Sequence, residues 1–197
     1  AERRDRRAAP YVGALLLRVD APRSSRVAAA TTLGRIGDPA AVAYLSRSVH
    51  DPAKEVRFAS ALALGKLRSQ SAVEVLSGVL RDDPHWWVRY AAAVALGDGR
   101  SPQAVPALSD ALTAELRWQV RQQAARSLGE IGTRAAVDAL GRALSDEDAT
   151  VRYSAARELG RVGGERTAGM LEQAYASEKD PLPRGQLRAS LKRVDQD

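Results

Sequence analysis

The sequence contains no cysteine, only one methionine and only two histidines among its 197 residues. The missing cysteines exclude disulfides, thiolate metal sites and a cysteine nucleophile. His50 and His85 are the only imidazoles, and without cysteine they support neither a catalytic triad nor a metal ligand set. We therefore predict no catalytic residue, no metal and no cofactor.

Long apolar runs are also missing, because no stretch approaches the roughly 18 consecutive apolar residues that a transmembrane helix needs. The composition, 45% hydrophobic and 27% charged, is typical of a soluble globular protein. We expect a soluble protein of the cytoplasm or periplasm. The compartment stays open, because the chain begins at Ala1 without an initiator methionine and a signal peptide before it would not be visible.

A strong excess of charge is lacking too, since the formal net charge is only +6. Of the 30 basic residues 26 are arginine, which with the abundant alanine we attribute to GC-rich codon usage rather than to nucleic-acid binding. The basic start of the chain, with Arg3, Arg4, Arg6 and Arg7, is diluted by acidic residues. Residues 1–8 are expected to form a solvated N-terminal tail.

What the sequence has in abundance is self-similarity. "VRFASALALGKL" (56–67), "VRYAAAVALGDG" (88–99), "VRQQAARSLGEI" (120–131) and "VRYSAARELGRV" (151–162) align without gaps. "SRVAAATTLGRI" (25–36) joins them, and "PRGQLRASLKRV" (183–194) is a degenerate sixth copy. The arginine near the start of each copy, here called the anchor arginine, recurs every 31 or 32 residues: Arg26, Arg57, Arg89, Arg121, Arg152 and Arg184.

Each repeat predicts two amphipathic helices. Small residues three and four positions after the anchor and a leucine seven after it form one stripe of a helix of period 3.6, helix B. These leucines are Leu33, Leu64, Leu96, Leu128, Leu159 and Leu191. A second apolar stripe precedes each copy and predicts helix A. A glycine that recurs at a fixed place in helix B is expected where helices pack closely: Gly34, Gly65, Gly97, Gly129 and Gly160.

An acidic residue stands six positions before every anchor arginine. These acids are Asp20, Asp51, Asp83, Glu115, Asp146 and Glu178. At the end of helix A, each can face the N-terminus of helix B and the anchor arginine of its own or the adjacent repeat. We expect a ladder of ion pairs between stacked repeats.

The acid-to-arginine spacing and the "VRxxAAxxLGxIG" string resemble HEAT repeats, in particular the short variety named after phycobilisome lyases. The resemblance covers about residues 9–194 and implies an all-α, right-handed α-solenoid (an α-α superhelix) of about six helix pairs. The expected repeats are approximately 9–37, 38–68, 69–100, 101–132, 133–163 and 164–194, with residues 195–197 as a C-terminal tail. In this family helix B lines the concave side of the solenoid.

Some residues of helix B are not needed by the core, at two to three positions before the anchor and one, five and nine after it. All three tryptophans and the single phenylalanine fall in this set, and exposed aromatic clusters mark interaction sites. We predict partner binding there. An alternative is that Trp86 and Trp118 fold over the seam between repeats as core. The predicted binding residues are Lys54, Phe58, Leu62, Lys66, Trp86, Trp87, Tyr90, Val94, Asp98, Trp118, Gln122, Arg126, Glu130, Tyr153, Arg157 and Arg161.

The third repeat departs from the pattern, because Gly99 stands where the other copies have isoleucine, leucine or valine. Helix B is expected to end early there and to leave a loop beside the aromatic residues.

The function predicted from these features is a scaffold that binds a protein or peptide in the concave groove, without catalysis. The resemblance leaves two alternatives. Phycobilin lyase subunits of this repeat type handle a tetrapyrrole, which aromatic and arginine side chains could cradle. HEAT-like DNA glycosylases use tryptophan, arginine and aspartate in a concave groove, and Trp87, Trp118, Asp98 and Arg126 fit that set superficially. Asp98 and Glu130 oppose a phosphate track, however, so nucleic acid is the less favoured partner, and the oligomeric state stays open.

Overall fold

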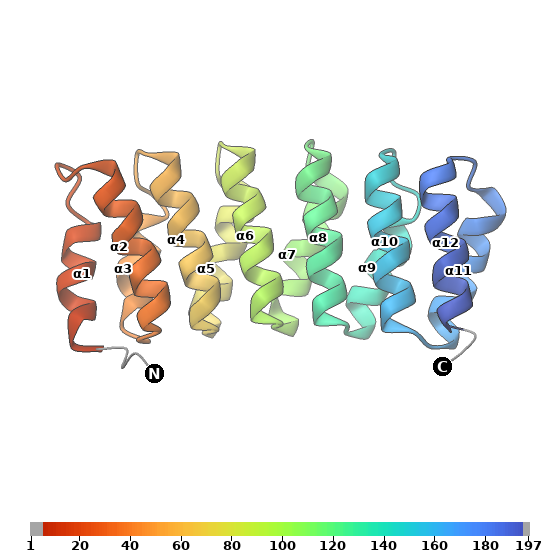
Figure 1. Cartoon of the computed structure of the whole chain (residues 1–197), viewed down its shortest axis with the longest axis horizontal. Helices are drawn as coiled ribbons and strands as arrows, with labels where there is room; N and C mark the ends of the chain where they lie inside the picture. The colour runs from red at the N-terminus through yellow and green to blue at the C-terminus, as the bar shows by residue number, and fades with distance from the viewer. Residues whose placement is uncertain (1–5, 195–197) are drawn as a thin grey trace. The chain divides into compact units, whose positions relative to one another are not determined.

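A computed structural model describes residues 6–194, and these residues form twelve α-helices, two single-turn 3-10 helices and no strand (Figure 1). The first helices of the pairs are α1 (Ala9–Leu16), α3 (Ala41–Ser48), α5 (Gln70–Asp82), α7 (Val105–Ala114), α9 (Arg134–Ala143) and α11 (Glu165–Ser177). The second helices are α2 (Arg23–Ile36), α4 (Lys54–Leu67), α6 (Trp86–Gly99), α8 (Trp118–Ile131), α10 (Ala149–Val162) and α12 (Pro181–Val194). The predicted all-α fold of six helix pairs is confirmed.

The predicted N-terminal tail lies partly, and the predicted C-terminal tail entirely, outside residues 6–194. Arg3 and Arg4 lie outside the described residues, as do residues 195–197. Arg6–Ala8 forms the 3-10 helix η1, directly before α1, and a second 3-10 helix, η2, spans Pro102–Ala104. The division of the chain into six repeats with two short tails stays a prediction.

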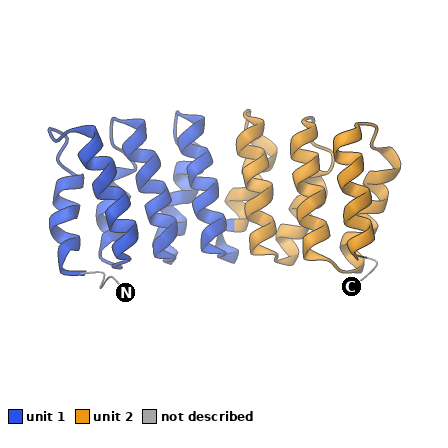
Figure 2. Ribbon diagram, viewed as in Figure 1, with its two compact units in different colours: residues 1–104 blue, residues 105–197 orange. Residues whose placement is uncertain are grey.

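The helices belong to two compact units, residues 1–104 and residues 105–197 (Figure 2). Each unit contains three helix pairs. Inside the first unit α2 packs on α4 and α4 on α6, and inside the second α8 packs on α10 and α10 on α12. In each unit the B helices therefore form one layer and the A helices a second layer behind it (Figure 1).

Columns of leucine form the core of both units. The leucine seven residues after the anchor is at most 1% exposed in the first five repeats, and the A helices contribute Leu16, Leu45, Leu76, Leu108, Leu140 and Leu171. The degenerate sixth repeat differs, because Leu191 is only half-buried and Leu187 is buried in its place. With bulkier side chains in this repeat, the core position moves one helical turn toward the start of α12.

The recurring glycines of helix B are contact points between neighbouring B helices. A β-carbon added at Gly34 would stand 2.9 Å from the Ala63 Cα, and one added at Gly65 would stand 2.8 Å from the Ala95 Cα. Real β-carbons essentially never approach other atoms this closely. The close-packing role predicted for these glycines is confirmed at Gly34, Gly65, Gly129 and Gly160, where the next B helix occupies the space.

Gly65→Ala is expected to lower the free energy of unfolding by about 1–3 kcal/mol, because the new methyl group meets the backbone of α6 and forces the helices apart. The matched control is Gly78→Ala in α5, where nothing lies within 4 Å of the added methyl. There alanine replaces glycine inside a helix and should stabilise the protein by about 0.5–1 kcal/mol. Urea unfolding followed by circular dichroism measures both. Equal effects would contradict the glycine contact.

The early end predicted for helix B of the third repeat is wrong. α6 spans 14 residues and ends at Gly99, the same length as α4 and α8. The residue after it, Arg100, adopts the left-handed conformation (φ 51°), as Arg68 does after α4 (φ 49°) and Gly132 after α8 (φ 66°). A left-handed residue stops the helix at the same register whatever stands before it, so Gly99 opens no additional loop.

Candidate functional site

The anchor arginines are occupied by the predicted ladder. In the first unit the Arg57 Nε donates to the Asp83 Oδ2 (2.7 Å) and its Nη2 to the Asp83 Oδ1 (3.1 Å). Its Nη1 donates to the backbone carbonyl of Asp51, the acid of its own repeat (3.1 Å). The Arg57 guanidinium group therefore joins a carbonyl of its own repeat to the carboxylate of the next repeat.

The same arrangement recurs in both units. Arg26 pairs with Asp51 at 3.1 Å, Arg121 with Asp146 at 2.9 Å and Arg152 with Glu178 at 2.7 Å. The carboxylates also accept a backbone N–H two residues further on, which shapes the turn into helix B, at Ala53, His85, Arg117, Asp148 and Asp180. Of the two arrangements left open by the sequence, the structure selects the pair between adjacent repeats.

The first acid, Asp20, is the exception to the ladder. No repeat precedes it within the described residues, and it pairs with Arg18 at 2.7 Å on the surface, where its side chain is 70% exposed. Arg26 donates instead to the carbonyl of Val19 (2.6 Å). An exposed pair of this kind contributes little to stability.

The ladder holds its groups in the charged state. The hydrogen bonds that Arg57, Arg121 and Arg152 donate to the carboxylates of the ladder raise the pKa of these arginines above the usual value. The hydrogen bond from Arg152 lowers the pKa of Glu178, although burial opposes this shift. These arginines are structural, so a partner must be bound by other residues.

The residues predicted to bind a partner lie on the outer side of the B helices, and we call this surface the helix-B face. None of the sixteen is buried. In the first unit α4 presents Lys54, Phe58, Leu62 and Lys66, and α6 presents Trp86, Trp87, Tyr90, Val94 and Asp98. In the second unit α8 presents Trp118, Gln122, Arg126 and Glu130, and α10 presents Tyr153, Arg157 and Arg161.

Two aromatic rings meet on the helix-B face of the first unit. Phe58 of α4 and Trp87 of α6 stack face to face, with 3.7 Å between ring centroids and 11° between ring planes. Beside them the Lys54 Nζ lies 3.1 Å from the His85 Nε2. An ammonium group can only donate, so the His85 Nε2 is the acceptor in this contact. The stack forms an apolar floor with a cation at its edge.

The tryptophans at the start of α6 and α8 do not complete the core. Trp86 is half-buried, and Trp118 is 39% exposed. Both side chains therefore retain surface that a partner could cover.

Charged residues dominate the helix-B face of the second unit. Arg157 and Arg161 of α10 both pair with Glu158, at 2.6 Å and 2.9 Å, and the carboxylate between them is only 5% exposed. Glu158 was not among the predicted residues. Its signal in the sequence is its position, six after the anchor, where the other repeats have threonine, alanine or serine. It packs over Gly129, whose missing side chain leaves room for it.

Two further clefts lie beside the ion pairs of the ladder and not on the helix-B face, and the sequence did not predict them. One of about 570 Å³ lies between α3 and α5, lined in part by Asp51, Arg57 and Asp83. Its counterpart in the second unit has about 450 Å³ and includes Arg121 and Asp146. Because ladder groups that already pair with each other line both clefts, they offer a ligand fewer free polar groups than the helix-B face.

Within residues 6–194, no three histidine, aspartate or glutamate side chains gather closely enough to hold a metal ion. No helix in the same range has the length and apolar character that crossing a bilayer requires.

The stacked helix pairs, the leucine columns and the ladder define an α-solenoid repeat protein. A model of HEAT repeats matches residues 9–97, 68–116 and 105–192, and the chain therefore belongs to the HEAT repeat family. The sequence matches none of the curated proteins with which it was compared.

Several solved structures share the fold. An engineered protein is 21% identical, covers 96% of this chain and 99% of its own, and superposes with a TM-score of 0.62. A designed armadillo repeat protein in complex with the peptide (KR)4 is 17% identical over 93% of this chain and 99% of its own, with a TM-score of 0.60. The CpcE–CpcF complex of phycocyanin lyase from Nostoc sp. PCC7120 is 21% identical over 94% of both chains, with a TM-score of 0.50. At these identities the likeness shows the fold alone.

Proposed function

We propose that this chain is a peptide- or protein-binding module, without catalysis, whose partner lies on the helix-B face. The observation that carries the proposal is the stack of Phe58 on Trp87. Both rings are half-exposed on adjacent B helices, outside the leucine core. An aromatic ring can bury about 150–250 Å² when a partner covers it, and tryptophan and tyrosine dominate binding hot spots.

The surroundings of the stack suit a peptide. Tyr90 and Val94 extend the apolar surface along α6, and Lys54, Lys66 and Asp98 supply charges of both signs at exposed positions. A surface with an apolar centre and a charged rim is the common organisation of protein interfaces. The designed armadillo repeat protein in complex with the peptide (KR)4 supports the proposal, because its solenoid has the same fold and binds a peptide.

Trp87→Ala is expected to weaken peptide binding about 30-fold or more, the loss that truncation of a hot-spot residue causes. Because the partner is unidentified, the probes are peptides enriched from a random display library on the wild-type protein. Fluorescence anisotropy with the purified peptides gives the dissociation constants of both proteins. Trp87 lies outside the leucine core, and stacking adds only about 0.5–1.5 kcal/mol beyond the area that the rings bury, so the variant should remain folded, as circular dichroism can check.

The matched control is Tyr11→Ala. Tyr11 is an aromatic residue of the same unit, 80% exposed, but it belongs to the A helix α1. Its removal should leave the peptide affinity within twofold of the wild type. Failure to enrich any peptide, or equal losses in the two variants, would reject the helix-B face as the binding surface.

A further inference from the structure

We infer that the helix-B face of the second unit contains a recognition site for a carboxylate side chain of an acidic peptide, a conclusion that rests on the proposed binding function. The site, which we call the arginine pocket, has a volume of about 440 Å³. Its charged and polar walls come from three consecutive B helices: Glu130 of α8, Arg157, Glu158 and Arg161 of α10, and Gln186 and Arg193 of α12.

A buried acid organises the arginine pocket. The Glu158 Oε1 accepts hydrogen bonds from the Nε and Nη2 of Arg157 (3.0 and 2.6 Å), and its Oε2 accepts one from the Nε of Arg161 (2.9 Å). A carboxylate with 5% exposure must be paired to be tolerated, and these two guanidinium groups supply the pairing. The pairing in turn fixes the orientation of both arginines before any ligand arrives.

The oriented arginines retain donors for a ligand. The bonds to Glu158 leave the Nη1 of Arg157 and both terminal nitrogens of Arg161 without a partner among residues 6–194. The two side chains are 42% and 44% exposed, so these nitrogens are accessible. Arg193 lines the same pocket from α12 and makes no ion pair within the described part of the chain. Guanidinium donors held in this way match the two oxygens of a carboxylate.

The charge balance of the arginine pocket favours a single negative charge. Three arginines and two glutamates line it, which leaves one positive charge in excess. A side chain of aspartate or glutamate would neutralise this excess. A phosphate group carries more charge and would meet Glu158 and Glu130, so the acids in the wall disfavour it. Arg126, on α8 of the same face, adds a further cation without an ion pair within residues 6–194, which suits acidic residues along a bound peptide.

The test uses a blocked octapeptide of alternating glycine and glutamate, and the same peptide with glutamine at every glutamate position. In nitrogen-15 NMR spectra the glutamate peptide should shift the Nε–H signals of Arg157 and Arg161 in a saturable way, and the glutamine peptide should not. Arg193→Gln, which leaves both bonds to Glu158 intact, should weaken binding at least tenfold. Arg161→Gln should do the same. Equal shifts with the two peptides, or unchanged affinity in both variants, would overturn the assignment.

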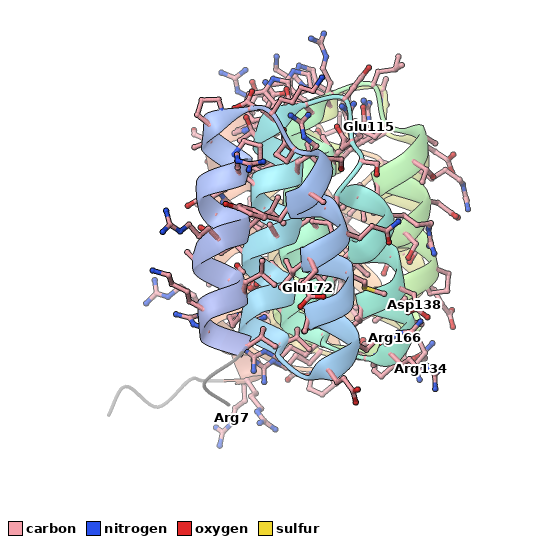
Figure 3. The ribbon with its side chains drawn as sticks, turned by 90° about the vertical axis from the view of Figure 1, so that its right-hand side faces the viewer. Arg7, Glu115, Arg134, Asp138, Arg166 and Glu172 are labelled. Atoms are coloured by element: carbon pink, nitrogen blue, oxygen red, sulfur yellow. The ribbon has the colours of Figure 1, made fainter. Side chains whose placement is uncertain are left out.

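Arg166→Gln is the matched control. Arg166 of α11 is also an exposed arginine of the second unit, paired with Asp138 of α9. In Figure 3 these two side chains lie together on the side of the A helices, away from α12. This variant should bind the glutamate peptide with the affinity of the wild type. A loss of affinity as large as in Arg193→Gln would mean that the peptide responds to the net positive charge of the protein and not to the arginine pocket.

Inorganic phosphate in place of the peptide separates the two anions. Weaker binding of phosphate than of the glutamate peptide supports the carboxylate assignment, and tighter binding overturns it in favour of a phosphate site. The experiments also distinguish a failure of the arginine pocket from a failure of the proposed function. If Trp87→Ala reduces binding of the display-selected peptides while the arginine variants do not affect the glutamate peptide, the arginine pocket alone is refuted. If instead Trp87→Ala does not change the affinity for the display-selected peptides, the proposed function is refuted.

Discussion

Asp83→Ala should lower the free energy of unfolding by about 3–5 kcal/mol, the cost of leaving a buried charge without its partner. Asp83 has a side chain that is 4% exposed and receives two hydrogen bonds from Arg57, whose side chain is 12% exposed. Without the carboxylate, a guanidinium group that is largely removed from water keeps its charge and loses its counter-ion. The backbone N–H of His85 also loses its acceptor, at the turn into α6.

The neighbouring residue provides the control for this prediction. Asp82 has the same side chain, but it is 65% exposed and pairs with Arg81, which is 75% exposed. Asp82→Ala should therefore change stability by less than about 0.5 kcal/mol, since solvent screens such pairs. Urea denaturation of the two variants beside the wild type measures the difference. A loss of similar size in both would mean that the ladder contributes only surface charge, contrary to its burial.

The ladder also illustrates how far sequence reasoning reaches. The six-residue spacing between acid and arginine was visible in every repeat, and it predicted that the two groups would meet. It did not determine whether Asp51 would pair with Arg57 of its own repeat or with Arg26 of the preceding one. That choice depends on the offset between stacked repeats, which no local pattern records. The structure places the Arg57 guanidinium on the Asp51 carbonyl and leaves the Asp51 carboxylate to Arg26.

On the helix-B face, too, the sequence predicted which residues are exposed but not which of them are in contact. Subtracting the core positions from helix B correctly separated exposed from buried residues, because burial follows the helical period. The helical period does not predict which of the exposed side chains contact each other. Phe58 follows its anchor arginine by one position and Trp87 precedes its own by two, and they meet because adjacent helices are staggered. Glu158 was missed for a related reason, since a charged residue in a core column was not recognised as the centre of a buried pair.

Leu96→Ala is the second prediction with a large effect, a loss of about 2–5 kcal/mol in the free energy of unfolding. Leu96 is 1% exposed in the third helix pair of the first unit, where α6 packs on both α4 and α5. Truncation removes apolar contacts and leaves a cavity that the surrounding helices can fill only in part, because neighbouring B helices already touch at the glycine positions. Thermal and urea unfolding should both show the loss.

Leu191→Ala tests whether the repeat or the local packing determines this cost. By the period of the sequence Leu191 is equivalent to Leu96, but it is half-buried, and Leu187 occupies the buried position of α12. We therefore expect Leu191→Ala to cost at most about half as much as Leu96→Ala, and Leu187→Ala to cost about the same as Leu96→Ala. If instead Leu191→Ala were the more damaging of the two substitutions in α12, the sixth repeat would pack in the register that the sequence period predicts, and the shift of its core by one helical turn would be wrong.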